Sequence, residues 1–242
     1  MKGHVASLWK RTKPGIQTDF LVREHIPKWL GKVKGKHILE AGCGEGYIVR
    51  KLTKLGADVD AFDNDPKMIR LAKRSERGCK KKANYKIGKL KDVNKMYPES
   101  AFDVTILSGV ICFLNEHELS DVLRKIYSVT KLGGKLLIAT NHTTSYFKKA
   151  KSKWIEYLTE PNTKLGTQKS VIYFNNSKGE HIYSGEIYFH TLKNITELLE
   201  AAGFLKIKFY EPLATKEDMK HYSKMWVDEG KIPFHLAVIA QK

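Results

Sequence analysis

The sequence predicts an α/β fold, in which a mostly parallel sheet carries helices on both faces and ends in an antiparallel strand. Strand-like apolar segments alternate with amphipathic helical segments, and this order is typical of parallel sheets covered by helices. The last two strand-like segments, residues 204–210 and 234–240, have no comparable helical segment between them. Such a pair favours an antiparallel edge.

The first two strands are each followed by a helix. A strand is expected at residues 37–41, with a helix from about 45 to 55 after a glycine-rich turn. The second strand is expected at residues 57–63. Asp65 is then suited to cap the next helix, because its side chain can accept a backbone N–H, and Pro66 suits the first helical position.

The middle of the chain continues the alternation. Residues 85–88 and 102–108 are expected to form the third and fourth strands. The next helix has a capping box made by Asn115 and Glu118, followed by apolar residues at helical spacing. A Leu-Gly-Gly turn ends this helix, and a fifth strand is expected at residues 135–140.

Thr191 to Gly203 is expected to form the last helix, which precedes the final pair of strands.

Two segments lie outside the alternation. Residues 1–36, with a helix expected at 20–30, are interpreted as an N-terminal helical cap. Residues 142–190 are interpreted as a substrate-covering insertion, because a connection of that length is usually functional or separately structured. Residues 37–141 and 191–242 then form the core of a single domain.

The chain has 242 residues and a net charge of +17. The excess is local, since residues 1–36 contribute +7 and residues 67–95 contribute +10. Such patches can bind RNA or other anions, but a solvated lysine-rich face is the simpler interpretation.

No apolar run reaches the roughly 18 residues of a membrane helix, and no signal sequence is evident. We therefore expect a cytoplasmic protein without membrane insertion. Its three cysteines form no metal spacing, so no metal site is predicted.

Glycines 42, 44 and 46 lie between the first strand and the first helix. Glycine permits positive φ and lets a ligand approach the backbone, although a tight turn alone could also explain it. A dinucleotide-binding fingerprint requires its third glycine at position 47, where this chain has Tyr47. The spacing therefore argues against that class of cofactor.

Glu40-Ala41-Gly42-Cys43-Gly44-Glu45-Gly46 instead resembles motif I of the class I S-adenosylmethionine-dependent methyltransferases. The resemblance implies a Rossmann-like sheet of seven strands and S-adenosylmethionine as the cofactor. It extends to residues 61–68, where it implies that Asp63, followed by Asn64, binds the ribose hydroxyls and that Met68 packs near the adenine.

Further segments follow in the family's order. Residues 88–92 resemble the adenine-contact loop, here with Lys89 and Leu90. Lys89 departs from the acidic residue often found there, because an ammonium cannot accept a hydrogen bond from adenine. Ser108 ends the fourth strand, where the family's backbone lies near the methionine part. Residues 131–138 and 199–204 resemble the family's turns into its fifth and sixth strands.

The resemblance does not reveal a catalytic residue, since this family needs a general base only when the acceptor carries a proton. The weak candidates are His142, Tyr146 and His190. The sequence lacks the Pro-Pro-aromatic and Pro-Cys motifs of nucleobase methylases, and it has Cys112-Phe113 where many small-molecule relatives place a histidine. We favour a small-molecule acceptor for O-, N- or C-methylation, resembling the quinone-biosynthesis-like branch. An RNA or protein methyltransferase that uses the basic segments, and a non-catalytic cofactor-binding regulator, are the alternatives. Nucleic acid is thus the less favoured partner, and no oligomeric state is predicted.

Overall fold

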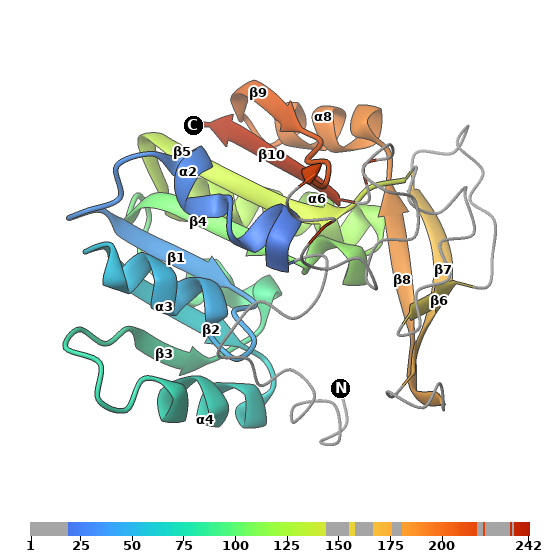
Figure 1. Cartoon of the computed structure of the whole chain (residues 1–242). Helices are drawn as coiled ribbons and strands as arrows, with labels where there is room; N and C mark the ends of the chain where they lie inside the picture. The colour runs from blue at the N-terminus through green and yellow to red at the C-terminus, as the bar shows by residue number, and fades with distance from the viewer. Residues whose placement is uncertain are drawn as a thin grey trace.

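A computed structural model describes residues 19–143, 155–157, 167–175, 181–216, 220, 233 and 235–242. Its main sheet has seven strands in the order β3-β2-β1-β4-β5-β10-β9 (Figure 1). The strands are β1 (His37–Ala41), β2 (Asp58–Asp63), β3 (Asn84–Ile87), β4 (Phe102–Ser108), β5 (Thr130–Asn141), β9 (Leu205–Tyr210) and β10 (His235–Gln241).

The sheet is parallel from β3 through β5 and becomes antiparallel at β10. β1 pairs in parallel with β2 on one side and β4 on the other. β10 runs antiparallel to both β5 and β9, and therefore lies inside the sheet rather than at its edge. The predicted fold class, including its antiparallel last strand, is confirmed. The carboxyl ends of β1, β2 and β4 consequently meet at one edge of the sheet.

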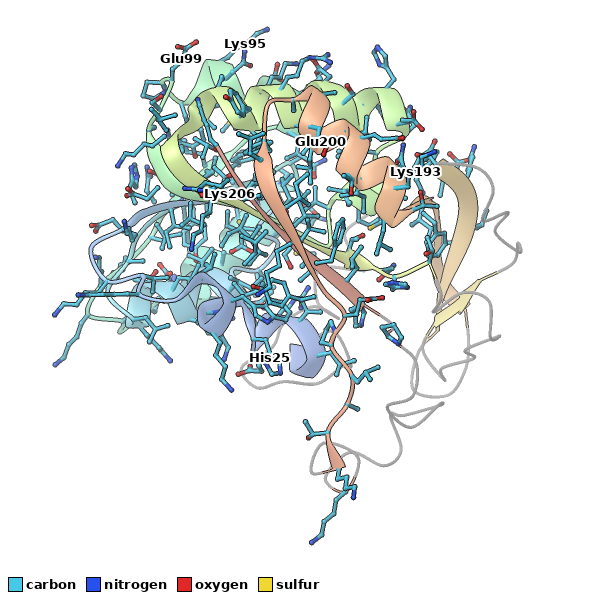
Figure 2. The ribbon with its side chains drawn as sticks, turned by 90° about the horizontal axis from the view of Figure 1, so that it is seen from above. His25, Lys95, Glu99, Lys193, Glu200 and Lys206 are labelled. Carbon is cyan, nitrogen blue, oxygen red and sulfur yellow. The ribbon has the colours of Figure 1, made fainter. Side chains whose placement is uncertain are left out.

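Helices cover both faces. One face carries α2 (Ile26–Leu30), α3 (Tyr47–Lys54) and α4 (Pro66–Ser75), and the other carries α5 (Val93–Met96), α6 (Glu116–Val129) and α8 (Leu192–Ala201). Figure 2 shows this division, with His25 on the side opposite to Lys193 and Glu200 of α8. Each face has its own cluster of buried apolar side chains, and the strands contribute alternate residues to the two clusters.

The single helix predicted at residues 20–30 is wrong in detail. The structure has a π-helical turn at Asp19–Arg23, and α2 begins only at Ile26. Pro27 stands at the start of α2 and has no N–H to continue a helix from the preceding turn, which explains the interruption. Trp29 of α2 stacks on Tyr210 of β9 with ring centroids 5.3 Å apart, so this segment lies across the sheet.

β5 is longer than predicted, because the Leu-Gly-Gly segment belongs to the strand. The register with β4 shifts between Phe102 and Val104, so this part is irregular. Gly133, at φ +76°, donates its N–H to the Lys242 carbonyl at 2.8 Å. Lys242 in turn donates to the Gly134 carbonyl at 2.9 Å, which extends the strand toward the C-terminal residue.

A second, antiparallel sheet contains β6 (Ile155–Tyr157), β7 (Thr167–Asn175) and β8 (His181–His190). It belongs to the segment interpreted as an insertion, and it stands beside the main sheet with β8 leading directly into α8 (Figure 1). Within the described ranges, no helix is both long and apolar enough to cross a membrane.

Candidate functional site

The glycine-rich loop between β1 and α3 needs its three glycines for different reasons. Gly42, Gly44 and Gly46 all have positive φ, at 79°, 54° and 77°. A Cβ on Gly42 would lie 2.6 Å from Val110 Cγ2, and one on Gly46 would lie 2.5 Å from the Tyr85 hydroxyl. A Cβ on Gly44 would meet nothing within 4 Å. Packing thus leaves no room for a side chain at Gly42 or Gly46. The space beside Gly44 is open, so that a ligand can approach the backbone there.

Asp63 ends β2 and contacts this loop. Its Oδ2 accepts from the Gly44 N–H at 2.9 Å, and its Oδ1 accepts from the Asp65 N–H at 2.9 Å. Burial raises the pKa of this carboxyl group, and these two backbone bonds act in the opposite direction. Because each carboxylate oxygen has two acceptor positions, acceptor capacity remains for a ligand.

Asp65 caps α4 as predicted, by accepting from the Lys67 N–H at 2.8 Å. Asp63 has a structural task in addition to the ribose-binding role that the resemblance implies, because it fixes the conformation of the glycine loop through Gly44.

Glu40 and Ser108 lie at the carboxyl ends of neighbouring strands, β1 and β4. Glu40 is 2% exposed, and its Oε2 has no hydrogen-bond partner in the part of the chain that the structure describes. Burial raises the pKa of Glu40 to about 8, although the positive charge of Arg23 opposes this shift. The buried Ser108 hydroxyl likewise lacks a partner among the described residues. Buried polar groups are nearly always satisfied, so this pair indicates a polar ligand.

The residues expected near the adenine border Asp63. The Gly88 N–H donates to the Asp63 carbonyl at 3.0 Å, which holds the 88–90 segment beside the β2 end. Met68 is buried within α4, whereas the Asn64 and Lys89 side chains are exposed. Leu90 is half-buried and begins a 3₁₀ turn.

Ile87 was missed by the sequence analysis. It pairs with Asp63 in the sheet register and is 59% exposed, which offers an apolar surface at the end of β3. An apolar residue at the end of a predicted strand carried no sign in the sequence that it would stay exposed.

His142 follows β5 and is 3% exposed. Its Nε2 lies 2.9 Å from Glu211 Oε1. Burial lowers the pKa of His142, and the adjacent Glu211 carboxylate acts in the opposite direction. Glu211, which follows β9, was not among the predicted residues. No motif marks it, since the two residues are far apart in the sequence.

His190 is held entirely by protein groups. Its Nε2 lies 3.2 Å from the Ile111 carbonyl and 3.0 Å from the Leu114 carbonyl. Its Nδ1 lies 3.0 Å from Thr167 Oγ1 and 3.2 Å from Asn194 Oδ1. Burial lowers the pKa of this imidazole. These contacts join β8 to the turn after β4. The remaining candidate, Tyr146, lies outside the described residues.

The site therefore brings Glu40, Gly44, Asp63 and Ser108 together at one edge of the sheet, with His142 at the end of the adjacent β5. The unpaired polar atoms of Glu40 and Ser108 fit a ligand that carries an ammonium group. The remaining acceptor positions of Asp63 fit vicinal hydroxyl groups on the same ligand. S-adenosylmethionine has both kinds of group, so the residues present fit this cofactor.

Comparison with known proteins agrees with this geometry. Residues 38–134 match a family model described as a methyltransferase domain. The demethylmenaquinone methyltransferase of Tropheryma whipplei is 24% identical over 209 residues, which cover 84% of this chain and 82% of that protein. The ubiquinone biosynthesis O-methyltransferase of Xanthomonas euvesicatoria is 28% identical over 119 residues, which are 48% of each chain.

Solved structures share the fold. The CcbJ methyltransferase from Streptomyces caelestis superposes with a TM-score of 0.71 and 13% identity, covering 98% of this chain and 95% of that one. A putative S-adenosylmethionine-dependent methyltransferase from Listeria monocytogenes gives a TM-score of 0.70 and 21% identity, with 90% and 95% covered. The matched domain contains the glycine loop, Asp63 and Ser108. The fold, the geometry of the site and these matches together support a class I S-adenosylmethionine-dependent methyltransferase.

Proposed function

We propose that this methyltransferase acts on a small-molecule acceptor and transfers the methyl group to a hydroxyl oxygen of that acceptor. The observation that carries the proposal is the His142–Glu211 pair at the end of β5, where Nε2 and Oε1 are 2.9 Å apart. A general base is required only for a nucleophile that carries a proton, so a buried imidazole at this edge favours a hydroxyl.

In this proposal, residues at the ends of β1, β2 and β4 bind the cofactor. Glu40 and Ser108 bind the methionine part, Asp63 and Asn64 bind the ribose, and Met68, Lys89 and Leu90 border the adenine. Ala41, Gly42, Gly44 and Gly46 supply the backbone approach, which is open at Gly44. When bound, S-adenosylmethionine supplies an electrophilic methyl group on a sulfonium. The protein then has mainly to align the acceptor and exclude water.

In this scheme, His142 takes the proton from the hydroxyl group of the substrate. Its burial lowers its pKa, which favours the neutral imidazole near neutral pH. The neutral ring has one unprotonated nitrogen, and we assign this nitrogen as the proton acceptor. Glu211 orients the ring and stabilises the imidazolium that forms.

The names of the relatives support a small acceptor, since they refer to demethylmenaquinone and to O-methylation in ubiquinone biosynthesis. The three free cysteines fit a reducing compartment, and we propose the cytoplasm as the location.

The test is methyl transfer to a panel of phenols, catechols and quinols, with amines as comparison, followed by mass spectrometry. We expect His142→Gln to lower kcat by about 100-fold on a weakly acidic phenol, since general-base catalysis contributes about 10²–10⁴. The variant should bind the cofactor normally in calorimetric titration.

An acceptor that is already ionised serves as the control. On a more acidic phenol the difference between wild type and His142→Gln should shrink, because the base is no longer needed. An equal loss on both phenols, or an unchanged kcat, would contradict the role of His142. Cofactor binding without transfer to any member of the panel would favour a regulatory cofactor-binding protein instead.

A further inference from the structure

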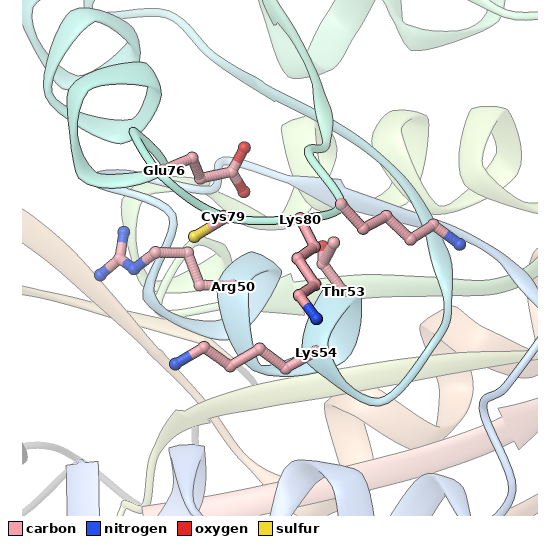
Figure 3. Close-up of a pocket in the computed structure, with 7 residues that line it drawn as sticks. Arg50, Thr53, Lys54, Glu76, Cys79 and Lys80 are labelled. Carbon is pink, nitrogen blue, oxygen red and sulfur yellow. The ribbon is translucent and has the colours of Figure 1, made fainter.

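A pocket of about 280 Å³ lies beside the second half of α3 (Figure 3). Arg50, Thr53 and Lys54 line it from α3, and Glu76, Cys79 and the lysines at 80 and 81 line it from the segment after α4. α3 begins at the glycine loop, and its eight residues span about 12 Å. None of the lining residues belongs to the glycine loop itself, although Arg50 bonds to Glu45 of that loop.

Two of the basic residues that line the pocket already have carboxylate partners. Arg50 donates to Glu45 at 2.7 Å, and Lys81 contacts Asp58 at 2.7 Å. The side chains of Lys54 and Lys80, in contrast, form no hydrogen bond or ion pair with any described residue. In Figure 3, Lys80 extends from its loop toward the end of α3 that carries Lys54. Two ammonium groups thus remain available to an anion.

The acidic residue of the pocket is occupied elsewhere. Glu76 is 3% exposed, and its Oε1 accepts from the Tyr85 hydroxyl at 3.0 Å. Its Oε2 accepts from the Ala83 N–H at 3.1 Å. Both carboxylate oxygens of Glu76 therefore already accept hydrogen bonds from the protein. The surrounding segment is basic as well, since six of the ten residues 73–82 are lysine or arginine and only Glu76 is acidic.

Size and chemistry indicate the class of ligand. Pockets for whole cofactors and drug-sized molecules span about 300–1,000 Å³, and this pocket of about 280 Å³ lies just below that range. No aromatic side chain lines it, so it offers no surface for stacking a nucleobase. Lysine ammonium groups are suited to phosphate as point charges.

We propose that this pocket binds a phosphate group, carried either by a small phosphorylated compound or by an anionic phospholipid headgroup. Lys54 and Lys80 provide the principal contacts. The site is independent of the methyl acceptor, and it gives the basic segment 67–95 a function that the cofactor site does not use.

Cys79 provides a direct probe of the pocket. It is partly exposed, whereas Cys43 and Cys112, the other two cysteines of the chain, are each 7% exposed. A maleimide reagent should therefore modify Cys79 first. We expect inorganic phosphate to slow this modification about tenfold at ten times its dissociation constant, by simple occupancy. Sodium chloride at equal ionic strength should have no such effect.

Lys54→Gln and Lys80→Gln test the assignment. Each should raise the phosphate concentration for half-protection of Cys79 by about tenfold, as expected for one charged hydrogen bond. The phosphate concentrations for half-protection are compared rather than the rates of modification, because a nearby lysine also changes the reactivity of the Cys79 thiol. The matched control is Lys193→Gln on α8, on the opposite face of the sheet (Figure 2), which should leave the midpoint unchanged. Equal protection by chloride, or unchanged midpoints in both pocket variants, would overturn the proposal.

The source of the phosphate is identified by two further probes, glycerol 3-phosphate and vesicles. Protection by glycerol 3-phosphate alone supports a soluble ligand. Protection and co-sedimentation with phosphatidylglycerol vesicles, but not phosphatidylcholine vesicles, supports a lipid headgroup. Protection of Cys79 by single-stranded RNA without protection by phosphate, glycerol 3-phosphate or vesicles would overturn the proposal in favour of a nucleic-acid surface.

Discussion

Glu40 is a buried carboxyl group at the point where a cationic ligand is expected. Desolvation makes its charged form costly, and burial raises its pKa to about 8. Near neutral pH the cofactor-free protein therefore holds Glu40 largely protonated. A bound ammonium group would favour the carboxylate, so cofactor binding and proton release are expected to be coupled at this residue.

Glu40→Gln should make the free energy of unfolding less dependent on pH. Between the unfolded value of 4.5 and about 8, the folded wild type keeps a proton that the unfolded chain has lost. Its stability consequently falls as pH rises, by at most about 1.4 kcal/mol per pH unit for this one group. Denaturant unfolding of wild type and variant across this range should show the variant gaining relative stability toward pH 8.

Glu99→Gln is the matched control, because Glu99 lies exposed on the surface (Figure 2). It should leave the pH dependence of wild type unchanged. If Glu40→Gln paralleled wild type at every pH, Glu40 would titrate normally in the folded state, and the proposed linkage to the cofactor would be lost.

Residues of this kind are only partly predictable from sequence. Motif spacing predicts Glu40, Gly44 and Asp63 as cofactor-binding residues, because the resemblance is carried by these residue types in that order. Glu211 could not be found this way, since its contact with His142 depends on how β9 and β5 are placed on either side of β10 in the folded chain. Local patterns contain no information about such pairs.

At the scale of secondary structure, β8 connects the small sheet to the main domain through His190. The imidazole reaches the Ile111 and Leu114 carbonyls on one side and Thr167 and Asn194 on the other. His190 thus fastens the turn after β4, which borders the proposed cofactor site, to β7, β8 and the first turn of α8.

His190→Ala should lower the free energy of unfolding by about 1–3 kcal/mol, because it leaves buried carbonyl groups without a donor. Hydrogen exchange should accelerate in β8 and at residues 111–114, while the rest of the main sheet keeps its protection. His190→Gln, which retains a donor, should recover part of the loss. A large fall in kcat with unchanged stability and exchange would instead indicate a catalytic role for His190.

Elements with complete local signals were predicted accurately. The capping box at Asn115 and Glu118 forms with both bonds at 2.9 Å, and α6 begins after Asn115. One error arose where a longer-range contact decides the outcome, since β5 begins early because Lys242 pairs with Gly133 and Gly134. The other error concerns a local signal, because the N-terminal helix is interrupted just before α2, whose first turn contains Pro27.

At the scale of the whole molecule, the two apolar clusters share a single sheet. Neighbouring residues of β1 face opposite sides, so that Ile38 belongs to one cluster and Leu39 to the other. Because both clusters depend on the same strands, loss of the packing on one face would also affect the packing on the other face. Alternation along the chain was enough to predict this layered class. It was the resemblance to a known family, rather than local patterns, that implied seven strands in a Rossmann-like sheet.

We therefore expect the main domain to unfold in one cooperative transition that shifts as a unit when the cofactor binds. A ligand at one hundred times its dissociation constant stabilises the folded state by about 2.7 kcal/mol. For a chain of this size each kcal/mol raises Tm by about 2–4 °C, so calorimetry should show an increase of about 5–11 °C. Gly44→Val should abolish the increase relative to its own cofactor-free Tm, because the side chain fills the open approach at Gly44. If the variant shifted as much as wild type, the loop would be only a turn. A split into two transitions would show that the two faces unfold separately, against the shared-sheet argument.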